Sequence, residues 1–350
     1  MVVVIPLKSP DSGPILKCDR LKDARARRVW RGPGCIAFMP ELPEVETIVR
    51  SLRPLVLGRQ ITAVELRRNG SSRSSHPTAS RILASPAREF EQRLPGCSIE
   101  SIERVGKNIV FHLRPYMGRE TRLYLLVHLG MTGRLTCETT PEFRQKHTHL
   151  VMALAEAGRR DSPHGTAPLE ELRWLHYSDI RRFGRLRLTA RPDEALSGLG
   201  ADPLEIREEE FFRLLRSRRS MLKSLLLDQH FLRGIGNIYA DESLFRAGIH
   251  PAAHAARLDR KRALRLYEGI RETLSQAIAQ GGSSISDFVD GQGYAGNFQV
   301  YHQVYQRTGE PCVRCGAAIR RIIVSSRGTH FCPRCQRGAE RRAAGVSLKK

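Results

Sequence analysis

The sequence predicts an α+β multidomain protein, with a β-sandwich and its leading helix first, a helical domain second and a small cysteine-rich β-hairpin last. Three observations support this prediction. A helical pattern is followed by a series of short apolar runs, the hydrophobic period becomes helical after residue 204, and four cysteines stand in two pairs near the C-terminus. With 350 residues, the chain is long enough to bury more than one core.

The first expected element is a helix over residues 42–57. Its apolar positions recur at helical spacing, and they include Val45, Ile48, Val49, Leu52, Leu55 and Val56. Prolines and glutamates occupy its first turn, where missing N–H groups and negative charge are both tolerated. Gly58 follows as a stop signal.

Short runs rich in branched and aromatic residues follow, and such runs are typical of strands. They cover residues 61–66, 108–113, 122–129, 150–154, 172–177 and 185–188. The polar stretches 69–88 and 155–168 separate some of them as loops. Short strands of this kind bury one face each, so this half of the chain is expected to form a β-sandwich.

Helical periodicity begins after a hinge at residues 199–204. The expected helices cover residues 208–216, 219–228, 241–247 and 259–279, and a loop is expected over 283–300. The predicted domains are a β-sandwich at 39–198, a helical domain at 205–300, a hairpin at 301–337 and a basic tail at 338–350.

Residues 1–38 differ from the rest of the chain. They are rich in Pro, Gly and Arg, and their one apolar burst is too short for a signal-peptide core. We expect a disordered extension, most simply upstream sequence read through from a misassigned start. A regulatory extension is the alternative.

The charge balance indicates a polyanionic partner. Lys and Arg number 58 against 36 Asp and Glu, and the isoelectric point is near 10.4. Phosphate contacts through such side chains supply most non-specific affinity for nucleic acid, although charge alone also fits a merely soluble basic surface. No apolar run approaches the roughly 18 residues that span a bilayer, so an integral membrane protein is not expected.

The strongest local pattern is a pair of C-x2-C motifs, formed by Cys312, Cys315, Cys332 and Cys335. This spacing is typical of a four-thiolate zinc site, and a closed four-cysteine site is usually structural. The stretch between the pairs alternates like a strand over 319–324 and turns at 325–328, so a zinc β-hairpin is expected. The other cysteines are scattered, which favours a reducing compartment.

Several polar groups stand at turns where they could contact phosphate or bases. Gly234 and Gly236 form a turn that feeds a helix, whose free N–H groups could bind phosphate together with Asn237, or the turn is simply a tight corner. Arg219 and Lys223 stand four residues apart, so a helix would place both on one face. Lys107, His147 and Arg327 stand at the ends of strand patterns and, taken singly, are more often ordinary surface residues.

Two other turns carry apolar side chains suited to entering a stack of bases. One contains Arg181 and Phe183, and the other carries Met131 between glycines. Each alone is more often a plain hairpin or a core residue.

The segment Pro40–Glu44 follows directly on Met39. If the chain began after this methionine, Pro40 would carry a secondary amine that can attack a sugar carbon and form an iminium. Inside the chain, its nitrogen is a tertiary amide and cannot be a nucleophile.

Taken together, these motifs resemble the bacterial formamidopyrimidine-DNA glycosylases, which excise oxidised purines. The matching segments stand in the family's order, and they are 39–47, 128–131, 179–184, 228–251 and the four-cysteine finger with Arg327. The resemblance implies an N-terminal β-sandwich, a helix–two-turn–helix DNA-binding domain and a zinc hairpin. It also implies one structural Zn²⁺, a partner of double-stranded DNA with oxidised bases, a monomer, and a cytoplasmic, nucleoid-associated location in a bacterium.

The resemblance implies a role for each matching residue. Pro40 would attack the sugar of the damaged nucleotide, and Glu41 would act as acid and base on the opening sugar. Lys107 and Arg327 would hold the flanking phosphates and assist β,δ-elimination. Six further residues would contact DNA or fill the gap left by the flipped lesion, and they are Met131, His147, Arg181, Phe183, Arg219 and Asn237.

Two alternatives remain open. An endonuclease VIII-like enzyme for oxidised pyrimidines is a sibling of this family, but it usually carries glycine where this chain has Leu42. A non-catalytic protein that binds damaged DNA is the second alternative, and it applies if Pro40 stays inside the chain.

Overall fold

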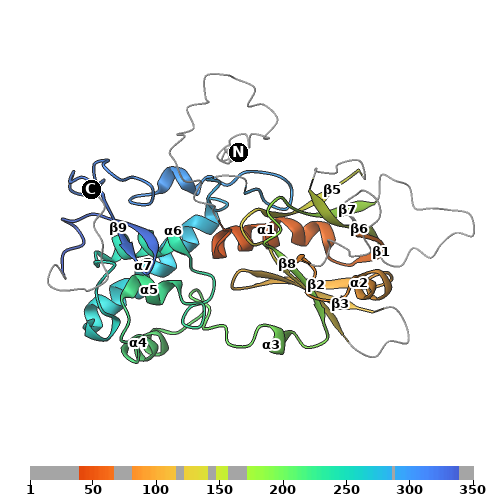
Figure 1. Ribbon diagram of the computed structural model, residues 1–350, viewed down its shortest axis with the longest axis horizontal. Helices are drawn as coiled ribbons and strands as arrows, with labels where there is room; N and C mark the ends of the chain where they lie inside the picture. Colours follow the sequence, from red (N-terminus) through yellow and green to blue (C-terminus); the bar gives the residue numbers. More distant parts are fainter. Residues whose placement is uncertain are drawn as a thin grey trace, which may run out of the picture.

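The computed structural model describes residues 39–66, 81–115, 122–140, 147–156, 172–285 and 288–338. The expected extension at 1–38 and residues 339–350 of the expected tail lie outside these ranges. Figure 1 shows the strands and most of the helices as two bodies side by side, with helix α1 (Leu42–Val56) between them. None of the described helices is long and apolar enough to cross a membrane.

Within the described residues, the first body is built from eight antiparallel strands. These are β1 (Arg59–Leu66), β2 (Ser98–Val105), β3 (Asn108–Arg114), β4 (Leu123–His128), β5 (Gly133–Glu138), β6 (Thr148–Glu156), β7 (Arg173–Asp179) and β8 (Arg185–Thr189). Their order is β5-β7-β6-β1-β2-β3-β4-β8. Strands β1 and β2 pair only at Gln60 and Ser98, so the sheet divides there into two four-stranded layers. The predicted β-sandwich is confirmed.

The sequence prediction missed strands β2 and β5. In β2, a bulge between Ile99 and Ser101 breaks the alternation of apolar and polar residues that would have marked a strand. Strand β5 mixes Gly133 and polar residues with only two buried hydrophobic residues, Leu135 and Cys137, so its pattern is weak. Each becomes a strand because neighbouring strands pair with it along its length.

Helix α1 belongs to the cores of both bodies. Val45, Ile48, Val49 and Leu52 are almost fully buried in the core of the sandwich. Leu42, at the first turn, packs instead into the core of the helical domain. The predicted leading helix is therefore confirmed, and it ties the two bodies together.

The helical domain contains α4 (Glu208–Arg216), α5 (Leu222–Leu227), α6 (Asn237–Ala247) and α7 (Arg260–Ala279). Helices α4 and α7 match the expected ranges closely. Helix α5 is shorter than the expected 219–228, because Met221 is extended and the chain before it turns to pack on residues 253–255. Helix α6 begins four residues before the expected start. Short helices α2 (Ala87–Arg93) and α3 (Pro192–Ala195) complete the set outside this domain.

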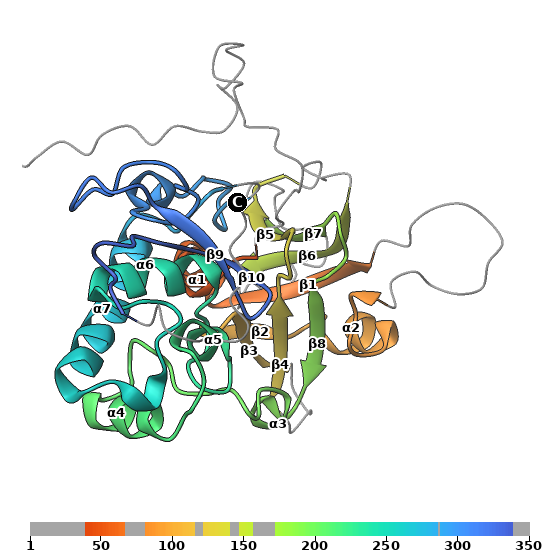
Figure 2. The same cartoon turned by 60° about the vertical axis from the view of Figure 1, so that its left-hand side comes forward.

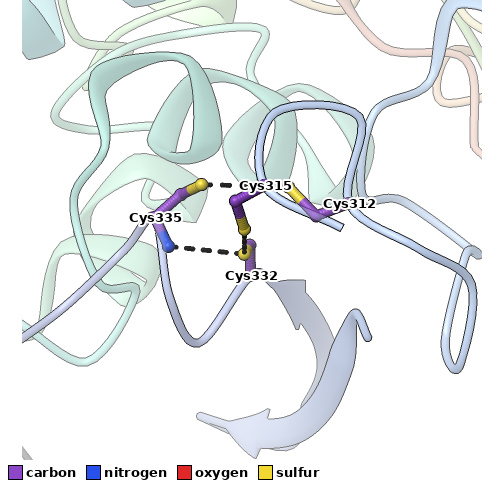
Figure 3. Close-up of side chains that lie close together, drawn as sticks. All are labelled: Cys312, Cys315, Cys332 and Cys335. Atoms are coloured by element: carbon purple, nitrogen blue, oxygen red, sulfur yellow. Dashed lines mark hydrogen bonds between the residues drawn. The ribbon is translucent and has the colours of Figure 1, made fainter. Parts of the chain in front are cut away.

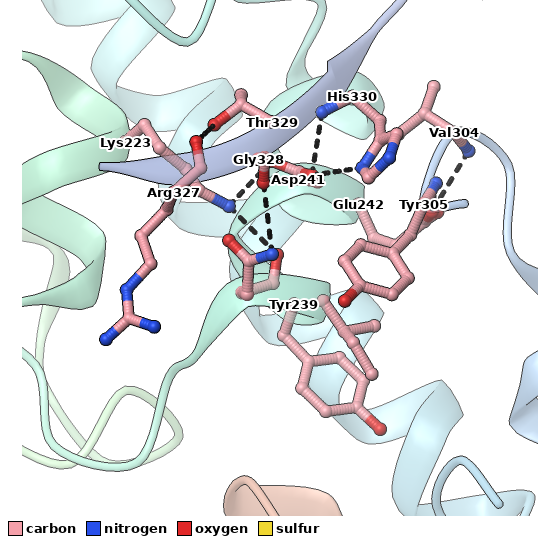
Figure 4. A network of polar contacts seen from close by, with 12 residues as sticks. Lys223, Tyr239, Asp241, Glu242, Val304, Tyr305, Arg327, Gly328, Thr329 and His330 are labelled. Atoms are coloured by element: carbon pink, nitrogen blue, oxygen red, sulfur yellow. Dashed lines mark hydrogen bonds and ion pairs between the residues drawn. The ribbon is translucent and has the colours of Figure 1, made fainter. Parts of the chain in front are cut away.

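Helix α6 is buried along nearly its whole length and is joined to the C-terminal part of the chain. The Glu242 carboxylate accepts backbone N–H bonds from Gln303, Val304 and Tyr305 at 2.8–3.0 Å. At the other end of the helix, Arg314 donates to two carbonyl groups of the last turn. The segment that leads to the C-terminal hairpin is therefore held on this one helix (Figure 4).

The C-terminal hairpin consists of β9 (Arg320–Val324) and β10 (Arg327–Phe331), paired so that Arg327 faces Val324. Its turn is made by Ser325 and Ser326, both with positive φ, as a two-residue hairpin turn requires. Figure 2 shows this hairpin in front of α1 and close to the ends of the sandwich strands. The turn thus directs the start of β10 towards the sandwich.

Candidate active site

The central feature of the site is the carboxylate of Glu41, which is 3% exposed. It accepts hydrogen bonds from the backbone N–H groups of Gly236 (2.8 Å), Ile238 (3.1 Å) and Tyr239 (3.4 Å). These groups form the N-terminus of α6, where the helix dipole also favours a negative charge. Burial nevertheless raises the pKa of Glu41 above its usual value, against the opposing effects of Lys107 and these N–H groups.

The two glycines of the turn before α6 are explained by this contact. A Cβ on Gly236 would collide with the Glu41 carboxyl carbon. A Cβ on Gly234, whose φ is +97°, would lie 2.8 Å from that of Leu42. The expectation that this turn offers free N–H groups to phosphate is therefore wrong, because Glu41 occupies them.

Asn237 lies at the start of the same helix, where it is partly exposed. Its side-chain amide donates to the carbonyl of Gly328 at 3.1 Å, which joins α6 to strand β10. In this arrangement its amide group already holds the hairpin. Its predicted contact with DNA remains a prediction.

Glu44 is a second buried carboxylate, one helical turn beyond Glu41. It accepts bonds from the backbone of Glu41 (2.8 Å), the backbone of Ser283 (2.7 Å) and the hydroxyl of Tyr239 (2.5 Å). Burial, followed by the nearby Glu41 carboxylate, raises the pKa of Glu44 to about 7. The Glu44 carboxyl group can therefore carry a proton near neutral pH.

Lys107 and Arg327 reach the same place from the two bodies. Lys107 stands in the two-residue turn between β2 and β3, next to Gly106 with φ +63°. Burial lowers the pKa of Lys107, Arg327 lowers it further, and Glu41 and Glu44 act in the opposite direction. Arg327 is exposed at the start of β10, and its side chain points away from the buried contacts of α6 (Figure 4).

Lys223 differs from its expected position. It is fully buried, and its ammonium group lies 2.6 Å from the Asp241 carboxylate and 2.9 Å from the carbonyl of Asn237. Arg219 is exposed and precedes α5. The two cations therefore do not share a helical face, because the helix begins only at Leu222 and turns Lys223 towards α6.

The other carboxylate oxygen of Asp241 holds the hairpin. It accepts bonds from the backbone N–H of His330 at 2.8 Å and from that residue's ring at 3.1 Å. Figure 4 shows Asp241 between Lys223 and strand β10. Asp241 therefore connects α5, α6 and β10, and it was not singled out from the sequence.

The two predicted wedge turns lie side by side. A Cβ on Gly130, beside Met131, would come within 2.6 Å of the backbone of Phe183 and Gly184. Met131 is partly buried, while Phe183 is 49% exposed and carries the Arg181 guanidinium 4.8 Å from its ring centre. The structure thus presents both turns together.

Asp179 is completely buried, and its carboxylate holds both turns in place. One of its oxygens accepts from the Thr132 hydroxyl (2.5 Å) and from the backbone of Arg181 (3.1 Å), and the other accepts from the backbone of Gly184 (2.8 Å). The carbonyl of His147 accepts from the backbone of Asp179 at 3.0 Å, so His147 lies beside the same turn. The sequence offered no sign of this role beyond an acid at the end of an apolar strand.

The four cysteines of the two C-x2-C motifs converge, with all their sulfur atoms within 4.8 Å of one another (Figure 3). The sulfur of Cys312 lies 3.8 Å from that of Cys335, and Cys315 lies 3.5 Å from Cys332. Tetrahedral Zn–S bonds of about 2.3 Å require sulfur separations of about 3.8 Å. The residues therefore fit one structural zinc ion.

Comparison with known proteins agrees with this arrangement. The model of the formamidopyrimidine-DNA glycosylase N-terminal domain matches residues 39–186, that of the H2TH domain of the same enzyme matches 199–289, and that of the zinc finger found in FPG and IleRS matches 309–338. The chain belongs to the formamidopyrimidine-DNA glycosylase family. The predicted membership and fold class are confirmed.

The chain matches relatives of this family over almost their whole length. The formamidopyrimidine-DNA glycosylase of Solibacter usitatus is 45% identical over 299 residues, which cover 85% of this chain and 100% of the relative. The enzyme of Bacillus subtilis is 39% identical over 308 residues, with 85% and 99% covered.

Solved structures of the family share the fold. A Lactococcus lactis FPG mutant in complex with Fapy-dG-containing DNA is 34% identical, with a TM-score of 0.71, and covers 85% of this chain and 100% of that one. A MutM structure with DNA containing carbocyclic 8-oxo-G gives a TM-score of 0.70 at the same identity and coverage.

Replacing Asp179 with Asn should loosen both wedge turns, because the new amide NH₂ cannot accept the N–H groups that the carboxylate holds. A lost buried bond of this kind costs about 1–3 kcal/mol, which makes local opening roughly 10- to 100-fold more frequent. Amide hydrogen exchange at Arg181 and Gly184 would measure this. Asp193→Asn, on the exposed helix α3, is the matched control, and equal exchange in both variants would contradict the role of Asp179.

Replacing Cys332 with Ala should release the zinc ion and unfold the hairpin, because a site of this kind folds around its metal. Zinc content and limited proteolysis of residues 309–338 would measure both effects. Cys137→Ala removes a buried thiol of the sandwich core and should keep the zinc. A zinc-free Cys332 variant with a protease-resistant hairpin would show that the metal is dispensable.

Proposed function

We propose that this protein is a bifunctional DNA glycosylase and AP lyase of base-excision repair, which removes oxidised purines such as 8-oxoguanine and formamidopyrimidines from duplex DNA. The observation that carries the proposal is that Glu41, which follows Pro40 directly, and Arg327 are both close enough to Lys107 to shift its pKa. These groups come from α1, the β2–β3 turn and the zinc hairpin, which are far apart in the sequence. Their convergence suits a reaction at a sugar that lies between two phosphates.

In the proposed reaction, the lone pair of a free Pro40 amine attacks C1′ of the damaged nucleotide. The C1′–N bond to the base breaks, and the base leaves with the bonding electrons and a proton. The sugar ring then opens, O4′ takes a proton, and an iminium forms between Pro40 and C1′. Glu41 suits the transfer to O4′, because burial raises its pKa and so favours the form of the carboxyl group that carries a proton.

Strand cleavage follows from the iminium. Loss of a C2′ proton expels the 3′ phosphate, and a second elimination expels the 5′ phosphate. Lys107 and Arg327 supply positive charge to these phosphates, and the lowered pKa of Lys107 also suits proton transfer. The zinc ion has no part in this chemistry, but it holds the hairpin that carries Arg327.

The remaining predicted residues are assigned to duplex binding. Met131, Arg181 and Phe183 would fill the gap left by the flipped nucleotide, which is supported by the adjacency of their turns. His147, Arg219 and Asn237 would contact the backbone. We further propose that the protein acts as a monomer and is associated with the nucleoid of a bacterial cell.

The deciding experiment is covalent trapping. The chain beginning at Pro40 is mixed with a duplex carrying 8-oxoguanine, borohydride is added, and the product is compared with that of the chain beginning at Met1. A covalent protein–DNA band with the Pro40 form alone would establish the iminium. Absence of a band from both forms, with lesion binding retained, would leave the alternative of a non-catalytic protein that binds damaged DNA.

Replacing Arg327 with Ala should leave the fold intact and slow incision by roughly 10- to 100-fold, since a lost charge-assisted contact costs about 1.5–3 kcal/mol. Incision of an 8-oxoguanine duplex in single turnover would measure this. Arg320→Ala, also exposed on the hairpin but at its opposite end, is the control. Equal rates for the two variants would mean that Arg327 is only a surface residue.

A further inference from the structure

A hollow of about 360 Å³ lies on the sandwich, between strands β4 and β8 and the chain that follows helix α3. Its apolar part is lined by Leu126, Leu196 and Leu199. Its polar part is lined by Asn108, His128, Arg185 and Arg187. Figure 2 shows α3 below β4 and β8, at the same edge of the molecule. The hollow is therefore amphipathic, and all the charge on it is positive.

The two arginines of the hollow are not neutralised. Both are exposed, and no carboxylate lines the hollow. Arg185 donates one bond, to the carbonyl of Gly184 at 2.9 Å. Among the described residues, neither Arg185 nor Arg187 forms an ion pair with an acidic residue, whereas other exposed arginines such as Arg114 and Arg213 do. A pair of free guanidinium groups in one hollow is suited to a phosphate.

His128 adds a neutral donor to this side of the hollow. Its Nδ1 accepts the backbone N–H of Gly130 at 3.2 Å, which leaves the proton on Nε2. Burial lowers the pKa of His128, and the charges of Lys107 and Arg185 lower it further. The ring therefore stays neutral at neutral pH and can donate, while the positive charge of the hollow comes from the arginines.

The hollow is continuous with the candidate active site. Asn108 follows Lys107 directly, at the start of β3, and its partner across the ladder is His128 at the end of β4. Arg185 faces His128 on the next strand, and Arg187 lies two residues further along the same face. A DNA backbone that passes Lys107 can therefore continue over the hollow.

We propose that this hollow binds a deoxyribose–phosphate unit of the bound duplex, outside the pair of phosphates that flank the lesion. The phosphate would lie on Arg185 and Arg187, and the sugar would cover Leu126 and Leu196. This inference rests on the proposed function, because it assumes that DNA passes Lys107. It assigns to the sandwich a share of duplex binding beyond the wedge turns.

The test compares the double variant Arg185→Gln/Arg187→Gln with the matched control Arg114→Gln/Arg213→Gln, in which two exposed arginines are lost elsewhere. Binding to an 8-oxoguanine duplex is measured from 50 to 200 mM salt. Loss of this one phosphate contact lowers the salt slope by about 0.9, so over this range the wild type should lose about 3.5-fold more affinity than the double variant does. The control should keep the wild-type slope.

A second measurement locates the phosphate. Duplexes are made with one neutral methylphosphonate at each position in turn, and one position should weaken the wild type but not the double variant. Equal salt slopes for the two double variants, or a loss that does not depend on position, would overturn the inference. Failure of the wild type to bind the lesion duplex would instead overturn the proposed function, so the two failures are distinguishable.

Discussion

The contact between the Glu41 carboxylate and the N-terminus of α6 is the interaction on which the rest of this site depends. It joins the first turn of α1 to the first turn of α6, and so it joins the sandwich to the helical domain. Burying a carboxylate costs several kcal/mol, and each charge-assisted N–H bond returns about 1.5–3 kcal/mol. The raised pKa of Glu41 shows that burial prevails. The burial that makes this contact costly also favours a carboxyl group that carries a proton.

Helix α6 connects that contact to the rest of the site. Its first turn holds Glu41, its middle holds β10 through Asp241 and the 303–305 segment through Glu242, and its last turn receives Arg314 from the zinc site. The position of Arg327 opposite Lys107 is therefore fixed through one rigid helix. In the proposed reaction, a structural zinc ion would contribute in this way, by holding the strand that carries Arg327.

The sandwich carries further side chains that are suited to the same partner. Asp179 is buried and fully bonded, and it fixes the two wedge turns without touching anything outside the protein. Arg185 and Arg187, a few residues later, are exposed, and neither forms an ion pair with an acid of the part of the chain that the structure describes. One acid thus orders the apolar wedges, while the hollow beside β8 has no carboxylate among the described residues that line it, which leaves positive charge available for a polyanion. The uneven distribution of acids, more than the net charge, decides which face is suited to DNA.

The sequence by itself determined the elements with a strong period and the residues with fixed spacing. The pattern of α1, the apolar runs of β3, β4 and β6, the long helix α7 and the two cysteine pairs were all legible, because each depends on contacts within a short stretch. The tertiary structure alone decided the rest. Strand β2 exists through its neighbours, Lys223 is buried because α6 offers it Asp241, and the N–H group of Gly236 is bound by Glu41, 195 residues earlier. Such long-range pairings of buried charges leave no periodic trace, since only the folded chain brings the partners together.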